Sequence, residues 1–85
     1  MEQKWHLYIV RCKDNSLYTG ITTNLLKRIT GHNAGKGAKY TAGRSPVTVE
    51  YCETCESENA ARKREAEIKG WAKSRKEDLI RKKNG

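Results

Sequence analysis

Residues 4–12 read KWHLYIVRC, and residues 17–20 read LYTG. The first stretch alternates, imperfectly, and is rich in aromatic and β-branched residues, a pattern that predicts a β-strand. Because side chains on a strand alternate between its faces, the two expected faces are Trp5, Leu7 and Ile9, and His6, Tyr8 and Val10. The strand would therefore present apolar residues on one face and a tyrosine on the other.

The segment between these stretches, KDNS at residues 13–16, consists of turn-forming residues. Residues 17–19 then predict a short return strand, so that the two strands form a hairpin. Tyr8 and Tyr18 would approach each other on one face of this hairpin. Gly20 is expected to end the return strand, at a point where the backbone needs a positive φ or a close approach.

The rest of the chain predicts three helices and a third strand. The spacing of apolar residues indicates helices at about 25–33, 58–72 and 75–82. Strict alternation in VTVEYC predicts a strand at residues 47–52. The order β-β-α-β-α-α predicts an α+β fold, a small three-stranded antiparallel sheet flanked by helices.

The composition limits the domain count and the class of partner. The chain has 85 residues, which suffices for one domain (residues 1–85, with a core at about 4–80) and is too few for two. Lys and Arg number 18 against 10 Asp and Glu, and the net charge of +8 attracts polyanions. We therefore expect a nucleic-acid partner, and not a membrane surface, because no basic segment carries a large apolar face.

The N-terminal segment and the apolar runs bear on location. No apolar run approaches the roughly 20 residues that span a bilayer. The segment MEQKWHLYIVRC has no secretory signal pattern. We expect a cytoplasmic protein that acts as a monomer.

The cysteines are Cys12, Cys52 and Cys55, an odd number that cannot all pair within one chain. Cys52 and Cys55 form a CxxC, which invites zinc or redox chemistry. A structural zinc site needs four ligands, and Cys12 with His6 or His32 would have to complete it. A CxxC on a strand points its two sulfurs to opposite faces, so reduced structural thiols are the favoured interpretation and a zinc-bound module is the alternative.

Arg28 and His32 lie four residues apart in the first predicted helix, so both side chains share one helix face and can converge on one point. Asn33 is expected as the C-cap of this helix. The following loop at residues 33–46 is long for so small a domain, and long loops are functional or disordered. The functional interpretation is contact with nucleic acid by Lys36, Lys39, Tyr40 and Arg44, and the alternative is a mobile solvated loop.

These residues carry a family resemblance. Residues 8–10 and 18–20, Tyr-Ile-Val and Tyr-Thr-Gly, resemble the two half-motifs of the GIY-YIG nuclease superfamily. Arg28 and His32 match its helix signature, and Glu65 falls in the second long helix, where the family places its metal-binding glutamate. The similarity covers about residues 5–80 and is greatest to the short stand-alone bacterial proteins of the YhbQ-like group, which is related to the nuclease subunit of a structure-specific endonuclease type.

The resemblance implies a metal-dependent nuclease that hydrolyses phosphodiester bonds in DNA, in processing of the repair or recombination type. Glu65 would hold one Mg²⁺ or Mn²⁺ ion, and Arg28 would bind the scissile phosphate. Tyr8 is favoured as the general base, with its pKa shifted down by the metal and Arg28, and Tyr18 would orient water or phosphate. His32 would relay the proton or hydrogen-bond the phosphate.

Two positions depart from the family pattern. His6 stands where the first half-motif has glycine, and Thr19 stands where the second has isoleucine. Neither position contributes a reacting group in the family, so both change packing more than chemistry. The alternative function is a non-catalytic module that binds DNA or RNA through the same basic surface. The small size suggests that a protein partner supplies targeting.

Overall fold

Strand β1 (Trp5–Arg11) is the centre of the structure, a computed structural model that describes residues 4–84. It pairs antiparallel with β2 (Leu17–Thr22) on one side and β3 (Thr48–Cys55) on the other, in the order β2-β1-β3. The predicted hairpin and three-stranded sheet are confirmed. Because β1 is paired at both edges and covered on both faces, its central residues are fully buried: Leu7, Tyr8, Ile9 and Val10.

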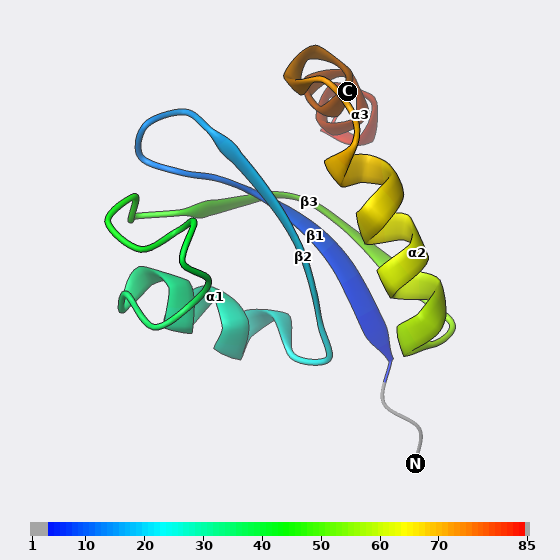
Figure 1. Ribbon diagram of the computed structural model, residues 1–85, viewed down its shortest axis with the longest axis horizontal. Coiled ribbons are helices and arrows are strands. Elements are labelled where there is room, and N and C mark those ends of the chain that lie inside the picture. Colours follow the sequence, from blue (N-terminus) through cyan, green and yellow to red (C-terminus); the bar gives the residue numbers. More distant parts are fainter. Residues whose placement is uncertain (1–3, 85) are drawn as a thin grey trace.

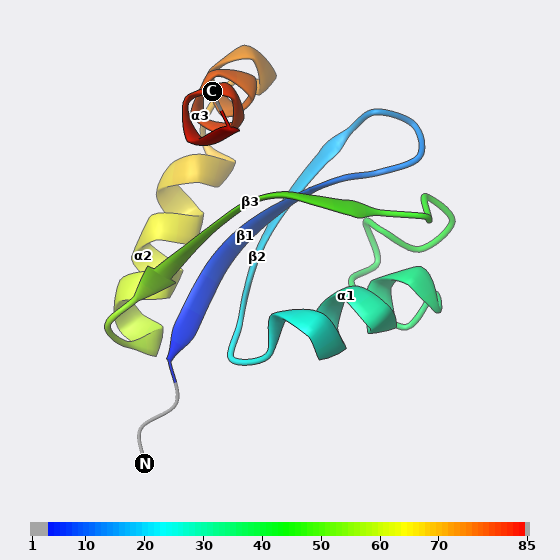
Figure 2. The same cartoon turned by 180° about the vertical axis from the view of Figure 1, so that it is seen from behind.

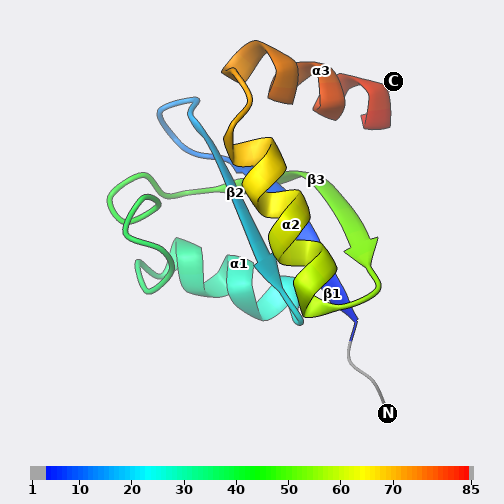
Figure 3. The same ribbon diagram turned by 45° about the vertical axis from the view of Figure 1, so that its right-hand side comes forward.

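The helices lie on both faces of the sheet. Helix α1 (Leu25–Asn33) covers one face, and α2 (Glu58–Lys69) and α3 (Lys73–Asn84) lie on the other (Figure 1). The reverse view shows the same separation of α1 from α2 and α3 (Figure 2). Helix α2 runs along the sheet, and α3 turns away at a steep angle (Figure 3). The predicted order β-β-α-β-α-α and α+β class are therefore confirmed.

Alternation along β1 sends its side chains into two separate clusters. The cluster on the side of α2 and α3 is apolar and contains Leu7, Ile9, Leu17, Cys55, Ala61, Ile68 and Ile80. The cluster on the side of α1 contains Tyr8, Val10, Cys12 and Val47, with Tyr18, Leu25 and Ile29 packed against it. Within residues 4–84, no helix is long and apolar enough to cross a membrane.

Strand β2 passes through Gly20 and ends at Thr22, so the prediction that Gly20 ends the strand is wrong. The predicted close approach is confirmed, because a Cβ at Gly20 would lie 2.5 Å from the Tyr8 hydroxyl. The register explains this contact, since Gly20 stands directly opposite Tyr8. Strand β3 also runs beyond its predicted end, because pairing with β1 continues as far as Cys55.

The last two helices differ from prediction at their ends. Helix α2 stops at Lys69 and not at about residue 72, and α3 begins at Lys73 and not at about 75. The N–H of Arg75 already donates to the carbonyl of Ala72 at 3.1 Å, which starts α3 earlier.

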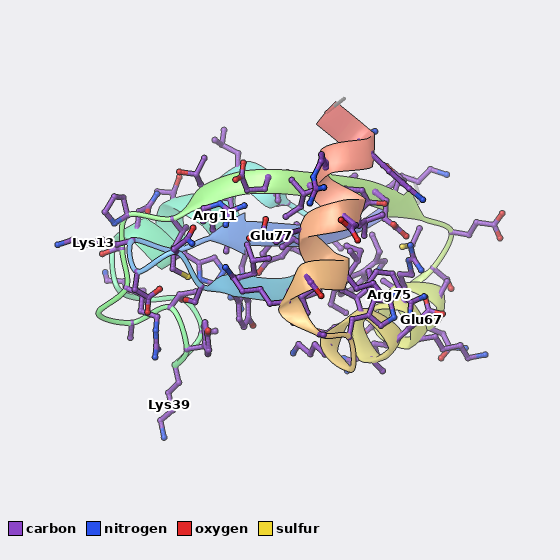
Figure 4. All side chains as sticks on the ribbon, turned by 90° about the horizontal axis from the view of Figure 1, so that it is seen from above. Arg11, Lys13, Lys39, Glu67, Arg75 and Glu77 are labelled. Carbon is purple, nitrogen blue, oxygen red and sulfur yellow. The ribbon has the colours of Figure 1, made fainter. Side chains whose placement is uncertain are left out.

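Arg11, at the end of β1, fastens α3 to the sheet. Its guanidinium donates to both carboxylate oxygens of Glu77, at 2.9 and 2.6 Å, and its Nε donates to Glu50 at 2.7 Å. Figure 4 shows Glu77 lying close to Arg11. The paired guanidinium lowers the pKa of Glu77 to about 2, so this two-bond contact stays charged at neutral pH.

Candidate active site

The polar side chains on the α1 side of the sheet meet at the hydroxyl of Tyr8. Nε2 of His32 lies 2.9 Å from this hydroxyl, and Nε of Arg28 donates to it at 3.3 Å. Both partners come from α1, one turn apart, as their spacing predicted. The structure therefore brings Tyr8, Arg28 and His32 into direct contact.

Tyr18 lies beside this group, on the neighbouring strand. Its ring centroid is 6.4 Å from that of Tyr8 and 5.5 Å from that of His32. The ring of Tyr40, from the basic loop, stacks on Tyr18 with centroids 5.7 Å apart. The ammonium of Lys69 lies 5.5 Å from the Tyr18 ring centroid. Tyr18 thus forms a half-buried wall of the site between an aromatic and a cationic neighbour.

Glu65 lies on α2, which packs along β2 and β1. Its side chain is 22% exposed, and Oε2 lies 3.2 Å from Nζ of Lys69. Burial is the main cause that raises the pKa of Tyr8, and the charge of Glu65 adds a smaller contribution in the same direction. Glu65 is thus paired with a lysine of its own helix, and that lysine lies against the Tyr18 ring.

The donor set allows a test of whether a divalent ion fits. Within residues 4–84, no group of three or more His, Cys, Asp or Glu side chains is placed to hold a metal. A metal at this site would have Glu65 as its protein carboxylate, with water and substrate phosphate oxygens as the other ligands. Mg²⁺ accepts such a set, because it keeps several waters and takes one or two carboxylates. Glu65 is a single, partly exposed carboxylate whose partner Lys69 lies against the Tyr18 ring, and it fits that requirement.

Desolvation is the main cause of the pKa shifts of the buried site residues. A pKa of Tyr8 lowered by the metal ion together with Arg28 stays a prediction. Burial raises the pKa of Tyr8, and the hydrogen bond and charge of Arg28 only partly offset it. Burial, and then Arg28, lowers the pKa of His32. Among the protein groups alone, desolvation thus outweighs the cation, and at neutral pH Tyr8 is a phenol beside a neutral imidazole.

The loop after α1 closes over His32 and supplies two residues that the sequence did not indicate. Oγ1 of Thr41 lies 2.7 Å from Nδ1 of His32, and Thr41 is fully buried. A Cβ at Gly37 would lie 2.1 Å from the same nitrogen, so the loop backbone reaches the ring only because residue 37 is glycine. A glycine a few residues after a site histidine is the one sequence feature that marks this return.

The loop is fastened at both ends. Asn33 was expected to be the helix C-cap, but Ala34 occupies that position. The Asn33 side chain instead accepts from the N–H of Val47 at 2.6 Å. Nε of Arg44 donates to Asp14 at 2.9 Å. These contacts hold the loop against β3 and against the β1–β2 turn.

The four predicted nucleic-acid contacts of the loop differ in their surroundings. Lys36 and Lys39 are exposed, and Lys39 projects away from the body of the molecule (Figure 4). The guanidinium of Arg44 lies 4.4 Å from the Tyr40 ring centroid and also donates to the Tyr40 carbonyl at 2.6 Å. Arg44 therefore clamps Tyr40 in place, whereas the two lysines extend into solvent.

A cleft opens beside Arg28 at the start of α1. It is lined by Thr22, Thr23, Asn24, Lys27, Arg28, Gly31 and Lys36. Among the described residues, no acidic side chain lines it, so three cations face one hollow. Lys27 is a member that the sequence did not indicate. A second cleft lies on α3, away from these residues, and is lined by Trp71, Arg75, Asp78, Leu79, Arg81 and Lys82.

The CxxC does not form part of the site. Cys52 and Cys55 lie three residues apart in β3, so their side chains point to opposite faces. Cys55 is buried in the apolar cluster with Ala61 and Ile68. Burial raises the pKa of both thiols, which suits reduced structural cysteines.

Comparison with known proteins identifies the family of the chain. Residues 4–78 match the family of the GIY-YIG catalytic domain. The chain belongs to the GIY-YIG family. Domains of this family are generally nucleases, and a nuclease acts on nucleic acid. The resemblance inferred from the half-motifs is confirmed.

Relatives within the GIY-YIG family are of similar length. The chain is 54% identical over 77 residues to a UPF0213 protein of Staphylococcus haemolyticus, covering 91% of this chain and 94% of that one. The solution NMR structure of a UPF0213 protein from Bacillus halodurans is 41% identical, with a TM-score of 0.63 over 96% of this chain and 87% of that one. That of an E. faecalis protein is 36% identical, with a TM-score of 0.67 over 98% and 88%.

Proposed function

We propose that this protein is a divalent-metal-dependent nuclease that hydrolyses phosphodiester bonds in DNA. The observation that carries the proposal is the contact of Arg28 and His32 with the one buried hydroxyl of Tyr8. Glu65 is linked to this group through Lys69, which lies against the Tyr18 ring. A proton donor and acceptor, a guanidinium and a carboxylate are the groups that phosphodiester hydrolysis requires. Their convergence within a GIY-YIG domain favours catalysis over a structural role.

Arg28 would bind the scissile phosphate. Its contact with Tyr8 is long, at 3.3 Å, and joins a cation to a neutral phenol. A phosphate is a stronger partner, because two charge-assisted bonds to its oxygens suit the planar guanidinium. Arg28 also lines the cationic cleft, so neighbouring phosphates of the bound strand would meet Lys27 and Lys36.

Tyr8 would act as the general base. The residue is fully buried, so water reaches its hydroxyl only after the substrate phosphate draws Arg28 aside. Because burial raises the pKa of Tyr8, the phenol keeps its proton at neutral pH. Its oxygen can accept a proton from water only if the phenolic proton is transferred to a neighbouring group. The neutral His32 at 2.9 Å is the adjacent group that can exchange that proton. Tyr18, on the outer side of Tyr8, would orient the water or the phosphate.

Glu65 would hold one Mg²⁺ or Mn²⁺ ion after Lys69 releases it. Bound there, the ion would supply positive charge to the pentavalent phosphate and to the leaving oxygen. Lys69 stays close to the Tyr18 ring and would face the same anion.

The family and the excess of positive charge support a setting in nucleic-acid processing. We assign the protein to DNA processing of the repair or recombination type, as a cytoplasmic monomer, with targeting by a separate protein. The exposed cations of the loop and cleft bind the backbone of nucleic acid without sequence readout.

One observation favours a second candidate, a binding module without turnover. Tyr8 is fully buried and Glu65 is already paired with Lys69, so the site needs rearrangement before it can react. The net charge of +8 would support binding by itself.

A cleavage panel separates the two functions. The substrates are a nick, a flap, a branched junction, a single-stranded end and RNA, each with Mg²⁺ and with Mn²⁺. Glu65→Gln should abolish cleavage and leave binding nearly unchanged, since the basic surface stays intact. Glu67→Gln is the matched control on the same helix, because Glu67 is 54% exposed and pairs with Arg64.

Two outcomes contradict the nuclease proposal. Cleavage that survives both Glu65→Gln and EDTA excludes the metal-dependent mechanism. Tight binding by the wild-type protein, with no cleavage of any substrate in either metal, supports the binding module.

A further inference from the structure

Thr41 is a fully buried hydroxyl residue in the loop after α1, outside both half-motifs. Its Oγ1 lies 2.7 Å from Nδ1 of His32 and 2.9 Å from the carbonyl oxygen of Ala38. A carbonyl oxygen only accepts hydrogen bonds, and a hydroxyl has one proton to donate. The Thr41 hydroxyl therefore donates a hydrogen bond to the Ala38 carbonyl and accepts a hydrogen bond from the Nδ1–H of His32.

The reverse assignment leaves two oxygens facing each other. If Thr41 donated its proton to Nδ1 of His32, its lone pairs would point at the Ala38 carbonyl across 2.9 Å with no hydrogen between them. Buried oxygens at that separation repel each other. The backbone at Ala38 thus selects the direction of the Thr41 hydrogen bond.

The hydrogen bonds of Tyr8, at the other end of this chain of contacts, also require Nε2 of His32 to be an acceptor. Nε of Arg28 donates to the Tyr8 oxygen at 3.3 Å, and a guanidinium only donates. The Tyr8 proton then has Nε2 of His32, 2.9 Å away, as its acceptor. A proton on Nε2 would leave the buried phenolic proton without an acceptor among the described residues.

From these two ends we propose that Thr41 is a positioning residue that holds neutral His32 in the tautomer protonated on Nδ1. Nε2 is thereby the acceptor for the Tyr8 proton. The hydrogen bonds then run in one direction, from Arg28 through Tyr8, His32 and Thr41 to Ala38. In water, histidine favours the opposite tautomer, so the protein imposes this one.

The catalytic consequence rests on the proposed function. As the water oxygen bonds to phosphorus, its O–H bond breaks and the proton goes to the Tyr8 oxygen. The original Tyr8 proton passes to Nε2 of His32, which becomes a cation. The Nδ1–H of His32 keeps its hydrogen bond to the Thr41 hydroxyl. The bond from phosphorus to the leaving oxygen breaks, that oxygen takes a proton from bulk water, and His32 later returns its extra proton through Tyr8.

Nitrogen NMR tests the tautomer directly in the wild-type protein. With ¹⁵N-labelled histidine, long-range ¹H–¹⁵N correlations at neutral pH distinguish a protonated from an unprotonated ring nitrogen. His6→Gln assigns the signals, since the chain has two histidines. We expect His32 to show a protonated Nδ1 and an unprotonated Nε2. A protonated Nε2, or an equal mixture, overturns the proposal, whether or not the protein cleaves DNA.

Two substitutions test the role of the hydroxyl. Thr41→Val keeps the shape and removes the hydrogen bond, and Thr41→Ser keeps the hydrogen bond. Thr41→Val should lose the tautomer and lower kcat by about 100-fold with little change in KM, the size of effect expected for a general base. Thr41→Ser should retain both the tautomer and the wild-type kcat. Thr30→Val is the control, because Thr30 is an exposed α1 residue whose hydroxyl donates to the Leu26 carbonyl.

A packing role for Thr41 would give the opposite pattern, with Thr41→Val active and Thr41→Ser impaired. Retention of the Nδ1-protonated tautomer in Thr41→Val also overturns the proposal. The nuclease assignment is tested separately by Glu65→Gln. The nuclease assignment stands if Glu65→Gln abolishes cleavage, even when NMR shows that His32 is not protonated on Nδ1.

Discussion

The two faces of the sheet bury different kinds of side chain against the same strand. On the side of α2 and α3, the fully buried residues are aliphatic, such as Leu7, Ile9 and Ile68. On the side of α1, Tyr8, His32 and Thr41 are fully buried and hydrogen-bonded to one another. Buried polar groups are tolerated only when they are satisfied, so the α1 side depends on directed contacts. Under the proposed function, stability depends mainly on the side of α2 and α3, and the chemistry depends on the side of α1.

The largest expected effect comes from the α1 side. Arg28→Lys keeps a positive charge but loses the planar pair of donors, so kcat/KM should fall by about 1000-fold, as for a lost transition-state donor. Urea denaturation should show a free energy of unfolding that is nearly unchanged. Arg62→Lys, on the exposed side of α2, is the control. A variant that folds and cleaves normally would remove Arg28 from the mechanism.

Substitution on the aliphatic side should do the reverse. Ile68→Ala creates a cavity in a fully buried position and should lower the free energy of unfolding by about 2–4 kcal/mol. The turnover of the remaining folded protein should stay close to that of the wild type. A large loss of kcat at full folding would show that the two faces are coupled.

A substitution at Gly20 should affect both stability and activity. A Cβ there would lie 2.5 Å from the Tyr8 hydroxyl, so Gly20→Ala should lower stability by about 2 kcal/mol and reduce activity as well. The matched control is Gly70→Ala after α2, where an added Cβ would lie no closer than 3.5 Å to the nearest atom. Thermal unfolding and cleavage rates measure the two effects. Equal results for the two variants would contradict the assigned contact.

The cationic cleft extends the α1 side to substrate binding. Combined Lys27→Ala and Lys36→Ala should weaken binding to single-stranded DNA by about 10-fold and reduce the slope of log K against log salt by about 1.4. The control pair is Lys63→Ala and Lys82→Ala, exposed residues on α2 and α3. Fluorescence anisotropy over a salt series measures both. An equal change in the control pair would indicate a general charge effect.

The smallest effect is expected at the polar exception on the aliphatic side. Thr19 is 2% exposed, and its Oγ1 has no hydrogen-bond partner among the described residues. Thr19→Val should therefore raise the free energy of unfolding by about 1 kcal/mol without a change in cleavage. Denaturant titration of the wild type and of Thr19→Val measures the difference in the free energy of unfolding. A loss of stability in the variant would mean that the Thr19 hydroxyl has a hydrogen-bond partner in solution.

Local sequence patterns predicted the elements and part of the site. Alternation places Tyr8 and Leu7 on opposite faces of β1, and helical spacing places Arg28 and His32 on one face of α1. Both features could be predicted because each pattern depends on a few neighbouring residues. The contact of Thr41 with His32 has no such pattern, since it depends on the path of the whole loop. Desolvation at Tyr8 was likewise missed, because the depth of burial depends on every element packed around it.

The sequence by itself determined the strands and helices, the positive charge and the family, because each of these is written in local composition and spacing. Only the tertiary structure decided which hydrogen bonds surround Tyr8. It also decided that Arg44 clamps Tyr40, whereas the pairing of Glu65 with Lys69, four residues on in the same helix, follows from local spacing. The reason is physical: a directed contact between buried polar groups requires the backbone of several elements to be in place first.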